Sequence, residues 1–251
     1  MCNFYGVTMP NKKKVEVKAN EVDISSNANV LKPVINGFDY GKALILIGDD
    51  DKQIKPVEAH WEFIPSWINS FQKVVEARKQ GIPWLNATSE KLLESNMFAE
   101  AANKRRCLVL ATHFYEWQQV NIPATKKKMS IPYAIKVAGE PYFFMAGIYN
   151  NFKDIYTGES FINFAIITTQ ANELMQQIHN TKKRMPTILN QELSWQWLQG
   201  SLKENYIKAI ASHQKASEEM EAFTISSNFK TAANPLMPSD YSAILKPNTL
   251  F

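Results

Sequence analysis

The apolar residues of this chain fall into short runs, most of them rich in β-branched and aromatic side chains and broken by Gly, Pro or Asp. Runs of this length and composition are typical of buried strands rather than of long helices. The pattern therefore predicts strands at residues 42–49, 55–67, 107–118, 133–139, 141–150, 161–169 and 185–189.

Helices are predicted between these runs. The helical period of residues 66–81 is carried by Ile68, Phe71, Val74 and Val75, with Gly81 at its end. Residues 88–106 predict a second helix or a pair of helices, which Thr88 or Ser89 can cap. Shorter helices are predicted at residues 170–180 and 190–201.

Several strands in succession with helices inserted between them indicate an α+β fold with a curled, largely antiparallel β-sheet or barrel-like core. A length of 251 residues without repeats or linkers predicts one domain over residues 1–251. Regular βαβ alternation is absent, as are the GxGxxG and GxxxxGK[ST] motifs, which excludes dinucleotide-binding and P-loop chemistry.

Composition narrows the class of protein further. Hydrophobic residues make up 45% and charged residues 21%, as in ordinary soluble proteins. Two cysteines are too few for a disulfide framework, and the four histidines lack metal-ligand spacing, so we expect a reducing cytoplasm, no metal and no cofactor. The apolar runs are far shorter than the roughly 20 residues that span a bilayer, and the N-terminus lacks a signal-peptide core, so no membrane partner is expected.

The net charge of +4 is mild, but the basic residues are clustered. Runs of Lys and Arg occur at residues 11–14, 104–106, 125–129 and 181–184. Each run alone is typical of a solvated loop. Together with 12% aromatic residues they also fit a polyanion-binding face, because Lys and Arg contact phosphates and bases stack on aromatic rings. Composition leaves both interpretations open.

The position of Cys2, directly behind Met1, carries a chemical possibility. Removal of Met1 would leave a thiol and a free α-amine on adjacent carbons, which titrate near about 8.5 and about 7.7–8.0 and are partly nucleophilic near neutral pH. A frayed terminus at which any small residue serves is the alternative.

Three further stretches place polar groups among apolar neighbours. Asn86, before a predicted helix, fits either a functional amide or a turn residue. Glu116, between Tyr115 and Trp117, fits either a general acid/base with a raised pKa or a strand-end residue facing solvent. His179, five residues before Arg184, fits either a proton-transfer group or a helix C-cap.

These residues occur in segments that resemble the SRAP family of SOS-response-associated peptidases, also called abasic-site processing proteins. The matching segments, in family order, are Met1-Cys2, "WEFIPSW" (61–67), "NATSE" (86–90), "HFYEW" (113–117) and "HNTKKRMPTIL" (179–189). The chain departs from the family pattern where Asn3-Phe4, Glu62, Thr88 and His113 replace Gly-Arg, Gly, Arg and Gly.

The resemblance implies a reaction at the N-terminus. The amine and thiol of Cys2 would form a thiazolidine with the aldehyde of an abasic site in single-stranded DNA, giving a covalent protein–DNA crosslink. Glu116 would be the general acid/base, His179 would assist proton transfer, and Asn86 would orient the amine. The family is also credited with removing residues ahead of the cysteine, here Met1, and with peptidase or lyase-like activity.

The resemblance also implies DNA contacts. Arg184 and Lys183 would hold phosphates and Trp67 would stack on or wedge a base, while Thr88 lacks the cation found there in the family. A cytoplasmic monomer, associated with the nucleoid when bound to DNA, is expected. Two other classes stay open: a cysteine peptidase or amidohydrolase using Cys2 and His179, and a single-stranded-DNA-binding module without chemistry.

Overall fold

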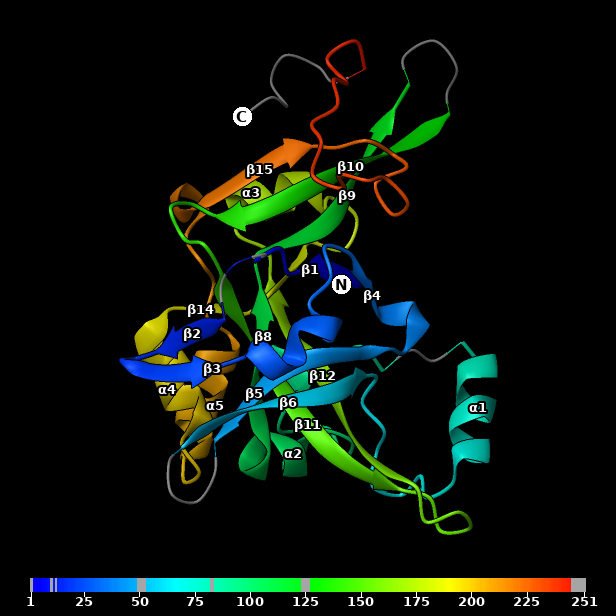
Figure 1. The fold of residues 1–251 in the computed structure, drawn as a ribbon. Coiled ribbons are helices and arrows are strands. Elements are labelled where there is room, and N and C mark those ends of the chain that lie inside the picture. The colour runs from blue at the N-terminus through cyan, green and yellow to red at the C-terminus, as the bar shows by residue number, and fades with distance from the viewer. Residues whose placement is uncertain are drawn as a thin grey trace.

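The computed structural model describes residues 2–9, 11, 13–48, 53–81, 84–122 and 127–244. Over these ranges the strands form a barrel and a second sheet, and the helices lie around them (Figure 1). All strand pairs except β6–β12 and β7–β12 are antiparallel within the described residues. The predicted α+β class with a largely antiparallel, barrel-like core and inserted helices is therefore confirmed.

Five strands close into the barrel: β5 (Lys42–Gly48), β6 (Ile54–Trp61), β8 (Arg106–Ala111), β11 (Phe143–Lys153) and β12 (Ser160–Gln170). They are hydrogen-bonded in the order β6-β5-β8-β11-β12, and β12 pairs again with β6. The closing pair sets Asn163 opposite His60. Strand β8 is buried along its whole length because other elements, helix α4 (Gln191–Leu198) among them, cover it on the outside of the barrel.

Short strands extend one end of the barrel. Strands β7 (Asn86–Thr88) and β13 (Arg184–Pro186) both pair with the last residues of β12, β7 in parallel and β13 antiparallel. Strand β14 (Ile188–Leu189) pairs with β11. The end of β12 thus brings together two chain segments that lie about a hundred positions apart in the sequence.

The second sheet is antiparallel and lies above the barrel in Figure 1. Its order is β15 (Met220–Thr224), β10 (Lys128–Val137), β9 (His113–Asn121), β1 (Phe4–Gly6) and β4 (Ile35–Asn36). The single strand predicted at residues 107–118 is wrong, because Thr112 separates β8 in the barrel from β9 in the second sheet. The Thr112 backbone N–H and hydroxyl both donate to the carbonyl of Gly6, which fixes the chain where it changes sheets.

The helices are shorter than the sequence pattern predicts. They are α1 (Phe71–Lys79), α2 (Ala99–Lys104), α3 (Glu173–Ile178), α4 and α5 (Glu204–Ala211). Helix α1 begins after Ser70, whose hydroxyl accepts from the backbone N–H of Lys73, so Ile68 lies outside it. In residues 88–106 only a 3-10 turn (Ser89–Lys91) and α2 are helical, and the side chain of Thr88 makes no capping bond. No helix in the described ranges has the length and hydropathy needed to cross a membrane.

The remaining elements are the hairpin β2 (Lys14–Val17) and β3 (Asn20–Asp23), and 3-10 turns at Ser25–Val30, Gly37–Asp39 and Ser217–Glu219. The strand predicted at residues 55–67 ends at Trp61 as β6. It ends there because Glu62 turns into the protein, where its carboxylate is 1% exposed and binds Arg78 of α1 at 2.5 Å. This ion pair attaches α1 to the barrel.

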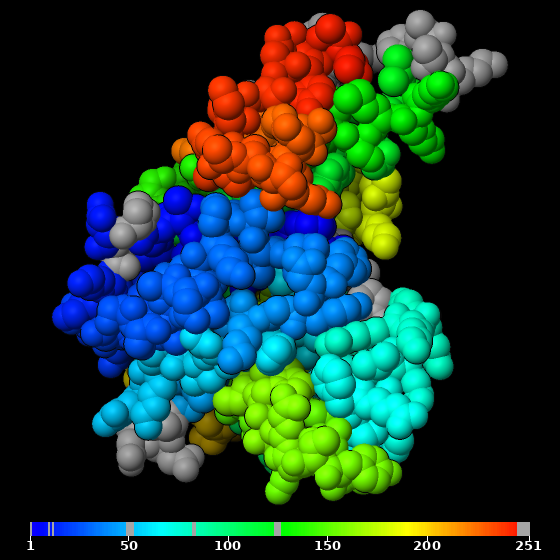
Figure 2. All heavy atoms as spheres, turned by 45° about the vertical axis from the view of Figure 1, so that its right-hand side comes forward, coloured from blue at the N-terminus to red at the C-terminus, as the bar shows by residue number. Residues whose placement is uncertain are grey.

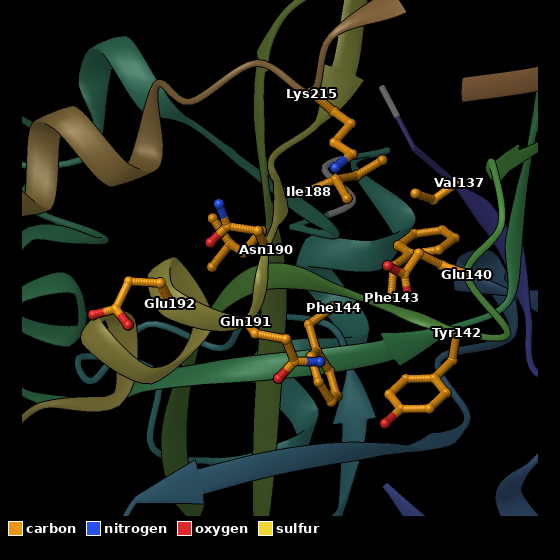
Figure 3. Close-up of a pocket in the computed structure, with 11 residues that line it drawn as sticks. Val137, Glu140, Tyr142, Phe143, Phe144, Ile188, Asn190, Gln191, Glu192 and Lys215 are labelled. Carbon is orange, nitrogen blue, oxygen red and sulfur yellow. The ribbon is translucent and has the colours of Figure 1, made fainter. Parts of the chain in front are cut away.

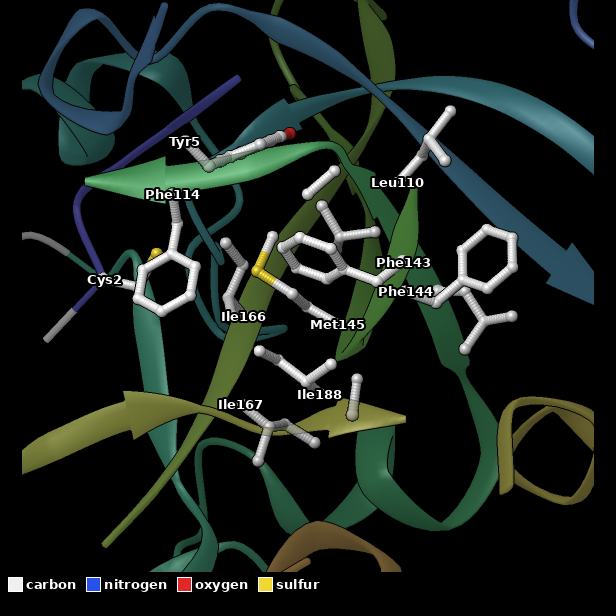
Figure 4. Close-up of a cluster of buried hydrophobic side chains, with 14 of the residues drawn as sticks. Cys2, Tyr5, Leu110, Phe114, Phe143, Phe144, Met145, Ile166, Ile167 and Ile188 are labelled. Atoms are coloured by element: carbon white, nitrogen blue, oxygen red, sulfur yellow. The ribbon is translucent and has the colours of Figure 1, made fainter. Parts of the chain in front are cut away.

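The main hydrophobic core fills the barrel and continues under strands β1 and β9. Figure 4 shows the part of this core where the two sheets meet, with Tyr5 and Phe114 from the second sheet and Met145 and Ile166 from the barrel. Cys2 belongs to the same cluster and lies beside Phe114. The chain terminus is therefore packed into the core from its second residue.

Arg106, at the start of β8, joins two helix ends. It is 5% exposed, and its five N–H groups donate to five backbone carbonyls. The acceptors are Ala102 and Asn103 of α2, Trp197 of α4, and Gln199 and Gly200 after α4. A cation at two helix C-termini is also favoured by the helix dipoles.

We expect Arg106→Met to lower the free energy of unfolding by about 2–3 kcal/mol, because it leaves buried carbonyl groups without donors. Arg105→Met is the matched control, since Arg105 makes only a partly exposed ion pair with Glu100 and one bond to Tyr149. Urea unfolding of both variants measures the difference. Equal stabilities would show that the carbonyl contacts of Arg106 contribute nothing.

Candidate active site

Strand β1 holds the N-terminal segment between two neighbours. Phe4 pairs with Asn36 of β4, Gly6 pairs with His113 of β9, and the carbonyl of Asn3 accepts from the N–H of Gly37 at 3.0 Å. A frayed terminus therefore does not describe the chain from residue 3 onward.

Cys2 itself is fully buried. Its Sγ lies 3.8 Å from the carbonyl oxygen of Phe4, and burial, with the nearby charge of Glu116, raises the pKa of the thiol. The side chain is therefore a thiol and not a thiolate at neutral pH.

His113, on β9, is accommodated by Gly6. A Cβ at position 6 would lie 2.3 Å from His113 Nε2 and 2.0 Å from the carbonyl oxygen of Pro33. Without that Cβ, the ring nitrogens of His113 lie 2.9 Å from the Pro33 carbonyl and 2.8 Å from the Thr112 hydroxyl. Burial lowers the pKa of His113 to about 4, so it is a neutral packing residue.

Glu116 and His179 form a buried acid/base pair. Glu116 comes from β9 and His179 ends α3, and they are only 4% and 6% exposed. Their closest atoms, Glu116 Oε2 and His179 Nε2, are 3.8 Å apart. Burial of Glu116 contradicts the alternative of a solvent-facing glutamate, while the C-cap position of His179 is confirmed.

The protonation states of this pair follow from its surroundings. Burial raises the pKa of Glu116 to about 7 and lowers the pKa of His179 to about 4, the latter with help from the charges of Lys182 and Arg184. His179 Nδ1 donates to the carbonyl of Arg184 at 2.8 Å, which leaves Nε2 as a proton acceptor facing Glu116. At neutral pH the site holds a neutral imidazole beside a carboxyl whose pKa is raised towards neutrality, a combination suited to moving protons.

Asn86 joins this site from β7. Its amide Nδ2 donates to Oδ1 of Asn3 at 3.2 Å, next to Cys2. Its Oδ1 is buried and finds no hydrogen-bond donor among the described residues. An orphan acceptor beside the N-terminal segment is a place where an amine would bind.

A cavity of about 350 Å³ opens onto these groups. It is lined by Asn3, Glu116, Trp117, Gln119, Ser130, His179, Thr181 and Lys182. Trp117 and Lys182 belong to the stretches "HFYEW" and "TKKR", whose composition is a signal for these two cavity residues. Gln119 and Ser130 carry no sequence signal, because only the pairing of β9 with β10 brings them to the cavity.

The four residues predicted to contact DNA lie outside that lining among the described residues. Arg184 Nη1 binds Glu90 Oε1 at 2.6 Å, and its other terminal nitrogen binds the carbonyl of Thr168. Thr88 lies opposite Thr168 in the β7–β12 register, so it is close to Arg184. Lys183 is exposed in the turn after His179, with a left-handed φ of 50°. Trp67, between β6 and α1, is 55% exposed.

A second cavity, of about 280 Å³, lies between the loop before β11 and the start of α4 (Figure 3). Glu140, Glu192 and Lys215 provide its charged groups, and Phe143, Phe144 and Ile188 its apolar wall. None of the residues singled out in the sequence lines it. In the described part of the chain, no group of three or more His, Cys, Asp or Glu residues could hold a metal ion.

Comparison with known proteins shows which proteins this chain resembles in sequence. A family model for the SOS response associated peptidase (SRAP) matches residues 1–232. The abasic site processing protein YoqW of Bacillus subtilis is 31% identical over 76% of this chain and 78% of its own length. The abasic site processing protein HMCES of Xenopus tropicalis is 30% identical over 55% of this chain and 43% of its own.

Solved structures show the same fold. A crystal structure of a protein from Bacteroides thetaiotaomicron superposes with a TM-score of 0.77 at 33% identity, over 94% of this chain and 97% of that one. A protein from Bordetella bronchiseptica reaches a TM-score of 0.71 at 18% identity, over 90% of this chain and all of its own, which is a likeness of fold alone.

Proposed function

The chain belongs to the SOS response associated peptidase (SRAP) family, and from this we propose that it processes abasic sites in DNA through a covalent bond to Cys2. The single observation that carries the proposal is one cavity lined by Asn3, the neighbour of Cys2, together with Glu116 and His179. Such a reaction needs a nucleophile close to an acid/base pair, and Cys2 is joined directly to the lining residue Asn3.

The proposed reaction starts when Met1 is removed, by self-processing or by another enzyme, and the α-amine of Cys2 becomes free. An abasic sugar in its ring-opened form carries an aldehyde at C1′. The amine adds to this aldehyde and one water leaves, which gives an imine. The thiol then adds across the C=N bond: sulfur bonds to C1′ and the thiol proton passes to nitrogen. The product is a five-membered thiazolidine, and no oxidant or reductant is needed.

The active-site groups have distinct proposed roles. Asn86 Oδ1 accepts a hydrogen bond from the amine and orients its lone pair towards the aldehyde. The carboxyl of Glu116 protonates the sugar ring oxygen during opening and the hydroxyl that leaves as water. Neutral His179 exchanges the proton with Glu116 through Nε2. Holding amine and thiol on adjacent carbons makes ring closure intramolecular, an effect that can lower a barrier by about 7–11 kcal/mol.

The alternative of a cysteine peptidase has weaker support. Such an enzyme needs a thiolate paired with a histidine. Here burial raises the pKa of the Cys2 thiol, and the two ring nitrogens of His179 face Arg184 and Glu116. A binding module without chemistry would have no use for a buried Glu116 with a raised pKa.

Intact mass spectrometry tests the proposal. Protein from which Met1 has been removed is incubated with an abasic single-stranded oligonucleotide and denatured. We expect a new species whose mass is that of protein plus oligonucleotide minus one water. The same oligonucleotide without the lesion is the control. Absence of the new species with the processed protein would refute the proposed function.

Single-stranded DNA is the proposed partner, and the surroundings of the cavity suit it. Lys182 lines the cavity and Lys183 follows it in an exposed turn, so positive charge gathers next to the lesion site. Trp67 is exposed enough to stack on a base. Arg184 is held by Glu90, and a phosphate would have to compete with that carboxylate. Thr88 offers a hydroxyl where the family pattern has a cation.

Arg184 and Glu90 therefore give a pair of opposite predictions. We expect Arg184→Ala to weaken binding of a single-stranded oligonucleotide several-fold and to reduce the salt dependence by roughly one unit or less. Glu90→Gln should strengthen binding, because it removes the competing negative charge and frees the guanidinium. Fluorescence anisotropy over a range of salt concentrations measures both. If Arg184 acts only within the fold, neither affinity nor salt slope will change in these directions.

A further inference from the structure

The segment after β15 folds back over the N-terminal strand. In Figure 2 this orange segment lies directly against the blue N-terminal part of the chain. Ile225 forms a bridge with Pro238, which closes the segment into a loop, residues 225–238. Phe229 anchors the loop: it is 1% exposed, stacks on Tyr115 with ring centroids 4.5 Å apart, and packs against Phe4 at 6.3 Å.

The anchor fixes the position of the next residue, Lys230. Its Nζ lies 4.2 Å from the ring centroid of Phe4 and 5.7 Å from that of Trp117. The two rings pack edge to face at 5.3 Å. Phe4 is two residues after Cys2, and Trp117 lines the candidate active-site cavity beside Glu116. An exposed ammonium group therefore lies over two aromatic rings, one of which belongs to the lining of that cavity.

We propose that Lys230, Phe4 and Trp117 form a nucleotide subsite that binds the DNA strand next to the lesion. The ammonium of Lys230 binds a backbone phosphate, and the partly exposed face of Trp117 stacks with the neighbouring base. The proposal deepens the proposed function and rests on DNA being the substrate. Residue 4 is an arginine in the family pattern and a phenylalanine in this chain. Lys230 places a positive charge over the ring of this phenylalanine.

The cation–π contact of Lys230 is weak enough to be replaced by contacts with DNA. An exposed cation–π contact contributes only about 0.5–1 kcal/mol, so the ammonium can leave the rings for a phosphate at small cost. Base stacking on an aromatic side chain contributes about 1–3 kcal/mol per base and tolerates any sequence. The subsite would therefore favour a single strand over a duplex, in which bases are already stacked, and would not select the flanking sequence.

The charge is tested by Lys230→Ala, with Lys136→Ala as the matched control. Lys136 makes a similar contact, 5.6 Å from the ring centroid of Phe223, but lies in β10 six positions beyond the cavity residue Ser130. Binding of an undamaged, labelled single-stranded oligonucleotide is measured by anisotropy at several salt concentrations. We expect Lys230→Ala to weaken binding about three- to tenfold and to lower the salt slope by roughly one unit or less, with Lys230→Arg restoring both.

The outcomes separate this proposal from the proposed function. Adduct formation by the wild-type protein at saturating abasic DNA is the readout of the proposed function, and Lys136→Ala should keep the wild-type rate because Lys136 lies away from the cavity. Wild-type affinity and salt slope in Lys230→Ala, or an equal loss in Lys136→Ala, would overturn the subsite while adduct formation continued. Failure of the wild-type protein to form any adduct would instead overturn the proposed function.

Stacking is tested by comparing Trp117→Phe with Trp117→Leu. Both variants remove the indole, but only phenylalanine keeps an aromatic face in the packing with Phe4 and Phe229. We expect the leucine variant to bind the same oligonucleotide at least fivefold more weakly than the phenylalanine variant. Equal affinities of the two variants would overturn the stacking role of Trp117.

Discussion

Glu116→Gln is expected to slow formation of the stable DNA adduct by about 10²–10⁴-fold, the range for a positioned acid/base group. Glutamine has the shape of glutamate but cannot give up or take a proton. The carboxyl is buried, has a pKa of about 7 and lies 3.8 Å from His179 Nε2, so the substitution removes the acid of the buried acid/base pair. Single-turnover rates, read from denaturing gels of an abasic oligonucleotide, measure the loss.

The pH profile identifies the cause. The free amine must be unprotonated to attack, which limits the rate at low pH, and Glu116 must be protonated to act as an acid, which limits it at high pH. The wild-type rate should therefore pass through a maximum with one apparent pKa near 7. The rate of Glu116→Gln should not show the fall at high pH that deprotonation of Glu116 causes in the wild type. Glu140→Gln, at the second cavity, is a control that should match the wild type.

Stability provides an independent check on the same variant. Burial raises the pKa of Glu116 from 4.5 to about 7 in the folded state, so the carboxyl favours folding in its protonated form. Its contribution is present below pH 4.5 and is lost as the pH rises through about 7. Glu116→Gln should thus be more stable than the wild type at pH 8 and no more stable at pH 4. If Glu116→Gln forms the adduct as fast as the wild type throughout pH 6–8, Glu116 is only a strand residue.

The barrel is the part of the fold that the hydrophobic pattern predicts well. Its strands are long and almost continuously apolar, so the runs at 42–49, 141–150 and 161–169 each match one strand. The shortest strands could not be predicted, because β1, β4 and β7 have only two or three residues. They exist through pairing with distant strands and not through local propensity.

The break between β8 and β9 at Thr112 could not be predicted either, because it also depends on a long-range contact. The run from Cys107 to Gln118 is mostly apolar or aromatic and contains no Gly or Pro that would mark a break, and β8 and β9 together take up nearly all of it. What divides it is a contact with Gly6, more than a hundred residues earlier in the chain. Long-range contacts of this kind have no signature in a local window.

For the candidate site, the sequence motifs predict several residues but not the contacts between them. Glu116 and His179 could be named from their motifs, but their contact could not, since 63 positions separate them and only the docking of α3 on β9 joins them. The motif that suggested Arg184 as a free phosphate ligand did not indicate its ion pair with Glu90. The contact of Lys230 with Phe4 could not be predicted from a local pattern, because it depends on the anchoring of Phe229.

Two of the departures from the family pattern have structural partners. Glu62 stands where the pattern has glycine, and its buried carboxylate is bound by both Nε and Nη2 of Arg78, which also lies 4.1 Å from the ring centroid of Tyr40. His113, also at a glycine position, fits because residue 6 has no Cβ. Neither change alters a group that lines the candidate active-site cavity. The chemistry is therefore separable from these substitutions.

Blocking the α-amine of Cys2 should abolish the stable adduct. Retention of Met1, or an N-terminal tag that is not removed, converts the nucleophilic nitrogen into an amide, which cannot form an imine although the thiol remains. Cys2→Ala, with Met1 removed, keeps the amine but cannot close the thiazolidine. This variant should give a labile complex that survives denaturation only after reduction with borohydride, with strand cleavage as a side reaction.

Cys107→Ala completes the set as the control. Cys107 lies inside β8, where its nitrogen is a backbone amide that cannot form an imine, so its removal should leave the adduct yield unchanged. A denaturing gel of abasic oligonucleotide with the wild type and these variants separates the contributions of amine and thiol. A stable adduct from the tagged protein would show that the amine is dispensable. In that case the bond would have to form at another group, and the buried Cys2 beside Asn3 and Phe4 would be a packing residue only.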